Sequence, residues 1–291
     1  MRPWTDRTGR FSALRSVVFI GVLTPALWIA AEAMLGGLGE RPVTEAIHQT
    51  GLWAIRLLAI SLAVTPLREA LRWPKLASVR RMLGLAVLAY ALLHFGLYIL
   101  NQHFDVAHIA SEIALRFYLA LGFIALCGFC VLGVTSTDTM IARLGSARWN
   151  RLHRFIYVGA VLATVHFFLQ SKLDVSQAIL MAGIFSLLAA YRIAKGRLGD
   201  LTASQLAGLA IFLTFSTAFG EALWYAWSVG APLILVLGAN FDFSYRVRPC
   251  WYALGAGLIL WAARLLRPWI ERTKFPPDAR ITAPQVQARS V

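Results

Sequence analysis

The sequence predicts an all-α protein, a polytopic bundle of membrane-spanning helices. Hydrophobic residues make up 58% of its 291 residues, charged residues 14%, and the mean hydropathy is +0.64. Soluble domains are about one quarter charged. Only helices or closed barrels satisfy their backbone groups in lipid, and the apolar blocks lack the two-residue alternation of a barrel. The blocks are therefore predicted to be helices.

Eight apolar blocks approach the length of roughly 20 residues that a helix needs to cross a membrane. In chain order they occupy residues 16–35, 52–71, 82–100, 117–136, 153–170, 177–194, 204–228 and 249–266. A ninth run, 231–239, is too short to span and is predicted to be re-entrant or interfacial. The first block is not predicted to be a cleaved signal peptide, because no small-x-small cleavage site follows it.

These blocks divide the chain into a six-helix domain and an extension of about two further helices. The expected boundaries are an N-terminal segment at 1–15, the six-helix domain at 16–197, the extension at 198–272 and a disordered tail at 273–291. The tail is polar and rich in proline, a composition typical of disordered segments. No internal repeat is visible in the sequence.

The positive charge is distributed asymmetrically along the chain. The formal net charge is +14, and most Lys and Arg lie in the two termini and in alternate loops such as 72–81 and 137–151. Because cytoplasmic loops carry the excess of Lys and Arg, both termini are predicted to be cytoplasmic. The loops near 36–51, 101–116 and 171–176 then face outward. This distribution of Lys and Arg argues against nucleic acid as a binding partner of the protein.

Two histidines within predicted spans indicate a haem site. His94 lies roughly 18 Å above the cytoplasmic end of its helix, and His166 lies about 20 Å above His153. His94 and His166 therefore share a level on two helices that run in the same direction. Facing imidazoles inside a helix bundle suit the axial positions of a haem iron. The alternative is that each histidine only makes a hydrogen bond between helices.

His153 lies at the cytoplasmic end of the helix that carries His166. It suggests a second haem level, but 13 residues turn a helix through roughly 140° net, so His153 and His166 do not share a face. His153 is also flanked by Arg151 and Arg154, as an ordinary interfacial residue would be. A second haem and a structural role both remain open for it.

Several other polar residues are candidates for binding a cofactor or a substrate. Arg56 either extends toward the membrane surface or pairs with haem propionates. Arg80 and Arg81 either bind propionates or a flavin phosphate, or attract anionic lipid. His48 is a candidate for an outer quinol site. Glu221 is a carboxylate within a span without an evident partner.

The remaining sequence features exclude most other chemistry. Cys127 and Cys130 form a C-x-x-C pair inside an apolar helix, where packing is the simpler interpretation than a redox or metal site. There is no dinucleotide-binding GxGxxG and no P-loop. Any redox function must therefore pass electrons between partners.

Five stretches of the sequence are characteristic of a known family. They are GLGERPVTEAIHQTG at 37–51, TPLREA at 65–70, RRMLGLAVLAYALLHFGLY at 80–98, RFYLALG at 116–122 and TSTDTMIARLGSARWNRLHRFIYVGAVLATVHF at 135–167. In these stretches the sequence resembles the haem-binding subunits of periplasmic protein-methionine-sulfoxide reductase systems (the MsrQ or YedZ family), which have a ferric-reductase-like transmembrane domain. The resemblance covers roughly residues 12–195.

The resemblance implies a six-helix b-type cytochrome that serves as an electron-transfer subunit and is not itself catalytic. It implies haem b, one or two per chain, an FMN site in some members, and ligands at His94, His153 and His166. Electrons would pass from the membrane quinone pool to a periplasmic molybdopterin subunit that repairs methionine sulfoxide. Where a fourth histidine would be needed, this chain has Arg80 and Arg81. Residues 198–291 extend beyond typical members.

Two other functions stay open at this stage. One is the haem domain of a metal-chelate (ferric) reductase fed by a separate flavoprotein. The other is a non-redox transporter or assembly factor, which the missing inverted repeat disfavours.

Overall fold

A computed structural model describes residues 3–5, 8–172, 174–244 and 246–274. The described part is an α-helical bundle without strands, and eight of its helical segments are long and apolar enough to cross a membrane. The predicted fold class is confirmed. We call the end of the bundle that carries α4 and α10 the outer end and the opposite end the inner end, following the predicted orientation. The disordered tail is predicted for 273–291, but the last helix continues to Lys274, and the rest of the predicted tail lies outside the described residues.

The spanning helices match the eight predicted blocks in order. They are α1 (Ala13–Leu35), α2 (Pro42–Ala70), α3 (Arg80–Asn101), α5 (Phe117–Val134), α7 (Ile156–Gln170), α8 (Ser176–Leu198), α9 (Ala203–Val229) and α11 (Pro249–Lys274). The predicted short run forms α10 (Leu233–Gly238), followed by the 3-10 helix η2 (Ala239–Phe241). A second 3-10 helix, η1 (Pro74–Val79), precedes α3 at the inner end.

Two segments predicted as loops are helices. They are α4 (Val106–Leu115) at the outer end and α6 (Asp138–His153) at the inner end. Both have side-chain N-caps, since Asp105 accepts from the backbone N–H of His108 and Thr137 from that of Met140. Such caps satisfy N–H groups that the first turn leaves free. Helix α2 also begins at Pro42, ten residues before the predicted block, because its first turns are too polar for a hydropathy criterion.

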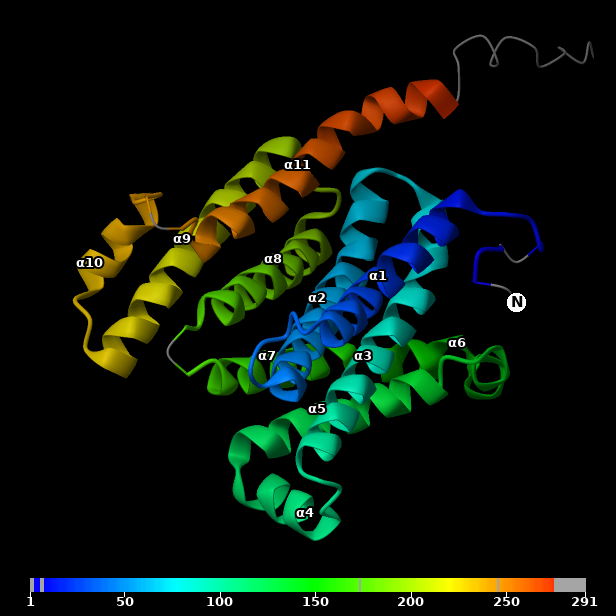
Figure 1. The fold of residues 1–291 in the computed structure, drawn as a ribbon. Coiled ribbons are helices and arrows are strands. Elements are labelled where there is room, and N and C mark those ends of the chain that lie inside the picture. Colours follow the sequence, from blue (N-terminus) through cyan, green and yellow to red (C-terminus); the bar gives the residue numbers. More distant parts are fainter. Residues whose placement is uncertain (1–2, 6–7, 173, 245, 275–291) are drawn as a thin grey trace, which may run out of the picture.

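Helices α2, α3, α5 and α7 form the centre of the bundle, with α1 and α8 packed against them and α9 and α11 beyond α8 (Figure 1). Their shared core is built of buried aliphatic residues around Phe129 and Tyr90. A separate apolar cluster joins α8 to α9 and α11. The division of the chain into a domain and an extension stays a prediction.

Two prolines inside spanning helices are compensated by side chains from neighbouring helices. Pro66 has no N–H to donate to the carbonyl of Leu62, and Arg192 of α8 donates to that oxygen at 2.6 Å. Beside Pro25 in α1, the Tyr90 hydroxyl accepts from the N–H of Ala26 at 2.9 Å and donates to the carbonyl of Val22 at 2.7 Å. Proline therefore helps to join α2 to α8 and α1 to α3.

Candidate functional site: two facing imidazoles

His94 and His166 face each other in the outer half of the bundle. Their ring centroids lie 6.4 Å apart, with an angle of 81° between the ring planes. His94 comes from α3 and His166 from α7, which run in the same direction. The two imidazoles thus meet at one depth, as the helical rise predicts.

Hydrogen bonds fix the tautomer of both rings. His94 Nδ1 lies 2.8 Å from the carbonyl oxygen of Ile47 in α2, and His166 Nδ1 lies 2.8 Å from that of Tyr118 in α5. A carbonyl only accepts, so each Nδ1 carries the proton and donates it. Each Nε2 is then the unprotonated nitrogen, the form that binds a metal.

The spacing of the rings suits one shared metal ion. An imidazole nitrogen binds a metal at about 2 Å, which places the centroids of two opposite ligands about 6 Å apart. Within the described residues, no group of three or more His, Cys, Asp or Glu could hold a metal ion. A porphyrin would supply the remaining ligands of a metal held between these rings.

A cavity of about 420 Å³ surrounds the two rings. This volume lies within the range of pockets that enclose a small organic cofactor. Most of its wall is aliphatic or aromatic, and its polar groups include His48, Tyr98, Gln170 and Ser171. The lining thus combines an apolar body with a few polar groups, which suits an amphipathic cofactor.

Sequence reasoning missed Tyr98 and Gln170, although a spacing signal exists for both. Tyr98 follows His94 by four residues and Gln170 follows His166 by four, which places each on the same helix face as its histidine. The Tyr98 hydroxyl is buried and has no hydrogen-bond partner in the described part of the chain. It is therefore free to bond a group in the cavity.

A second cavity, of about 300 Å³, lies toward the inner end and contains His153. The His153 ring stacks on Trp149 with centroids 3.8 Å apart. Its Nδ1 lies 3.2 Å from the carbonyl of Trp149, and its Nε2 lies 3.2 Å from Ser136 Oγ. No second histidine lines this cavity among the described residues.

Arginines line the inner cavity in place of that histidine. They are Arg68, Arg80 and Arg81. Arg81 also pairs with Asp138 of α6 at 2.7 Å. Phe129 lines both the inner and the outer cavity, so a single ring lies between them. The structure therefore brings the predicted residues Arg81 and His153 into one cavity and separates them from the outer pair.

Arg56 does not line either cavity. Its guanidinium donates to Gln177 Oε1 of α8 at 3.2 Å and lies 5.2 Å from the centre of the Trp53 ring. A role for Arg56 in binding propionates stays a prediction.

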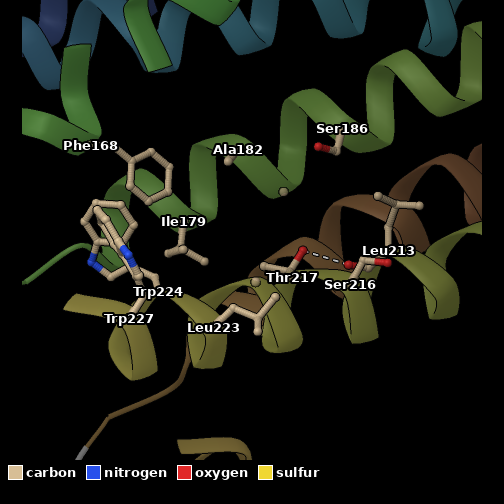
Figure 2. Close-up of a pocket in the computed structure, with 12 residues that line it drawn as sticks. Phe168, Ile179, Ala182, Ser186, Leu213, Ser216, Thr217, Leu223, Trp224 and Trp227 are labelled. Atoms are coloured by element: carbon tan, nitrogen blue, oxygen red, sulfur yellow. Dashed lines mark hydrogen bonds between the residues drawn. The ribbon is translucent and has the colours of Figure 1, made fainter. Parts of the chain in front are cut away.

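Figure 2 shows a third hollow of about 430 Å³, between α8 and α9 beside the end of α7. Small residues such as Ala182 and Gly220 form much of its wall, and the rings of Phe168, Trp224 and Trp227 gather at one end. Phe168 follows Phe167, which lines the outer cavity. Residues of α7 therefore line both this crevice and the outer cavity, which contains His166.

Glu221, which had no evident partner in the sequence, is fully buried and paired. Arg248 donates to its Oε1 at 3.3 Å, from the loop that leads into α11. Nearby, Arg246 pairs with Asp174 at 3.0 Å. These two pairs connect the last part of the chain to α9 and to the loop between α7 and α8 at the outer end.

Comparison with known proteins places the chain in a family. Residues 50–164 match the model of the ferric reductase like transmembrane component. A protein-methionine-sulfoxide reductase heme-binding subunit MsrQ from Rhodospirillum rubrum is 40% identical over 189 residues, which are 65% of this chain and 88% of that relative. The chain belongs to the MsrQ family.

Further MsrQ relatives agree with this assignment. The subunit of the same name from Deinococcus radiodurans is 39% identical over 60% of this chain and 87% of its own length. That of Caulobacter vibrioides is 34% identical over 62% of this chain and 87% of its own length. These MsrQ proteins are shorter than this chain. No solved structure matches the chain.

Proposed function

We propose that this protein is a b-type haem subunit of an electron-transfer complex in the cell inner membrane, with His94 and His166 as axial ligands of an outer haem. The observation that carries the proposal is the facing pair of imidazoles, each with Nδ1 bonded to a helix carbonyl and Nε2 free. The MsrQ relatives, which are named heme-binding subunits, support the same cofactor.

The protein residues hold and insulate this cofactor. Haem supplies one-electron chemistry at its iron when bound. His94 and His166 fix its position, and the apolar walls around Phe95 and Phe167 exclude water. Tyr98 lines the cavity, and its buried hydroxyl has no hydrogen-bond partner among the described residues, so it could donate to a polar group of the cofactor. Low polarity and imidazole ligation are among the means by which a protein sets a haem potential.

The complex that we propose takes electrons from membrane quinol and delivers them to a periplasmic molybdopterin subunit that reduces methionine sulfoxide. The relatives are named heme-binding subunits of a protein-methionine-sulfoxide reductase, which supports an acceptor that reduces methionine sulfoxide. The crevice between α8 and α9 supports a lipid-soluble donor, because it adjoins the helix that carries His166 and gathers three aromatic rings at one end. The catalytic chemistry belongs to the partner subunit.

The residues that line the inner cavity support the binding of a second cofactor, which would be anionic. Arginine side chains bind carboxylates and phosphates well, and three of them line this cavity beside His153 and Trp149. A second haem would present its propionates there, and an FMN its phosphate. The same arginines favour the alternative function, a reductase haem domain that takes electrons from a cytoplasmic flavoprotein.

An optical spectrum of the detergent-purified protein, oxidised and then reduced with dithionite, tests the proposal. We expect the sharp reduced bands of a low-spin b-type haem, with haem and flavin counted per chain. Reduction by a quinol would support the quinone pool as donor, whereas reduction only by NADPH with a flavin reductase would support the alternative. A colourless protein from haem-replete cells would contradict both.

A further inference from the structure

Two helix pairs present their histidines in the same way. In the pair α2–α3, Gly51 precedes His94 by 43 residues, and in the pair α5–α7, Gly122 precedes His166 by 44. Both histidines are followed by a phenylalanine that lines the outer cavity. The two helix pairs therefore share a spacing of glycine, histidine and phenylalanine around the outer cavity.

In each pair, the histidine bonds a carbonyl four residues before the glycine. His94 bonds the carbonyl of Ile47, four before Gly51, and His166 bonds that of Tyr118, four before Gly122. Such a carbonyl already accepts the N–H of the residue four positions later and has one lone pair left. Side chains on a helix lean toward its N-terminus, so a side chain at the glycine would stand beside this oxygen.

Both glycines also lie directly against the imidazoles. A Cβ atom at Gly51 would lie 2.9 Å from His94 Nδ1, and one at Gly122 would lie 2.8 Å from His166 Nδ1. Distances below 3.0 Å are too short for a carbon atom in contact with a ring, so the ring would have to move. Each ring is held by its hydrogen bond on one side and faces the other imidazole across the cavity.

We propose that Gly51 and Gly122 are a matched pair of positioning residues, whose missing side chains let His94 and His166 donate from Nδ1 and so direct both Nε2 atoms at one metal. This proposal rests on the proposed haem function. The Nδ1–H bond to a carbonyl makes an imidazole a more basic ligand. A more basic ligand stabilises the ferric state, so the two glycines also keep the haem potential low.

The test compares Gly51→Ala and Gly122→Ala with two matched controls. Gly96 lies on α3, two residues after His94, and Gly128 lies on α5, six residues after Gly122. A Cβ at either control position meets nothing within 4 Å. All four changes improve helix propensity to the same extent, so propensity does not explain a difference between the two sets.

The full-length variants are purified in detergent and measured for haem per chain, electron paramagnetic resonance and midpoint potential. We expect Gly51→Ala and Gly122→Ala to retain haem about 10- to 100-fold more weakly, as for other residues that orient metal ligands. Their remaining haem should have altered g values and a higher potential. Gly96→Ala and Gly128→Ala should match the wild type. Equal behaviour of all four variants would overturn the proposal.

Two further measurements keep the outcome decisive. If Gly51→Ala does not insert into the membrane, the double variant Gly51→Ala/His94→Ala is measured. Restored insertion of the double variant supports a clash between the new side chain and the imidazole ring. Continued failure to insert overturns the proposal. If the wild type binds no haem, the proposed function fails by itself. The positioning is then read from the Nδ1–H signals of ¹⁵N-histidine in the haem-free protein. Gly51→Ala should perturb that of His94, and an unchanged signal would contradict the proposal.

Discussion

The outer and inner halves of the bundle use the same helices to build different sites. In the outer half, α3 and α7 present two imidazoles to each other. In the inner half, α7 is preceded by His153, while α3 begins with arginines. Arg81 precedes His153 by 72 residues, the same separation as between His94 and His166. A guanidinium thus stands at the position where this spacing would place a second inner imidazole.

This difference changes the kind of ligand that each half suits. Two neutral imidazoles bind a metal between them, whereas three guanidinium groups beside one imidazole favour an anion, although two of the three, Arg68 and Arg81, already pair with carboxylates. The charged residues differ as well, because the carboxylate of the outer pair, Glu221, is fully buried, whereas that of the inner network, Asp200, is exposed and pairs with the buried Arg267. We therefore expect substitutions in the outer half and substitutions in the inner half to have different effects on the protein.

Removing an outer imidazole should have the largest effect. His94→Ala and His166→Ala are each expected to abolish the six-coordinate low-spin spectrum, since one axial ligand is lost while the apolar walls remain. Optical spectra of the purified variants measure this, with insertion checked by membrane fractionation. His108→Ala, in α4 outside the cavities, is the control. Wild-type spectra in both variants would remove the distinction between the two halves.

Changes in the inner cavity should leave the outer spectrum intact. His153→Ala and Arg81→Ala are expected to weaken retention of a second cofactor by about tenfold or more. Cofactor analysis per chain, for haem and for flavin, measures this separately from the low-spin bands. Arg143→Ala on the exposed side of α6 serves as the matched arginine control. Loss of the outer haem in either variant would mean that the two cavities act as one site.

The buried outer ion pair should contribute to stability and not to the spectrum. Glu221→Ala leaves Arg248 without its partner and is expected to cost about 1–3 kcal/mol. Thermal unfolding of the haem-loaded protein in detergent measures the loss. The double variant Glu221→Ala/Arg248→Ala should recover part of it, because no charge is then left unpaired. A single variant as stable as the wild type would show that the pair contributes little.

The inner network at Asp200 should have the smallest effect, and a defined pH dependence. A hydrogen bond from Arg267 lowers the pKa of Asp200 below its usual value. The stabilisation is therefore present above the usual Asp pKa of about 3.9 and is lost as pH falls through the lower folded value.

Asp200→Asn should remove this dependence at a cost of about 1 kcal/mol, because the carboxylate is largely exposed and an amide oxygen can still accept from the buried Arg267. Unfolding temperatures measured across acidic pH test the sign. A protein that gains stability on acidification relative to Asp200→Asn would contradict it.

The sequence by itself determined the number and order of the spanning helices. Long apolar runs in lipid have no stable alternative to the helix, so hydropathy locates them almost without tertiary information. The common depth of His94 and His166 also followed from the fixed rise of the helix. Helices α4 and α6 were missed because they are short or polar, and only their caps at Asp105 and Thr137 indicate them.

Only the tertiary structure decided which groups meet. Depth along a helix does not give its rotation, so the carbonyl partners of the two histidines and the roles of Gly51 and Gly122 required the packing of neighbouring helices. The partner of Glu221 lies 27 residues away on another segment. For Arg56 the sequence left two roles open, and only the packing of α8 shows that its guanidinium bonds Gln177. Helix formation is local, whereas contacts between helices depend on how the whole bundle closes.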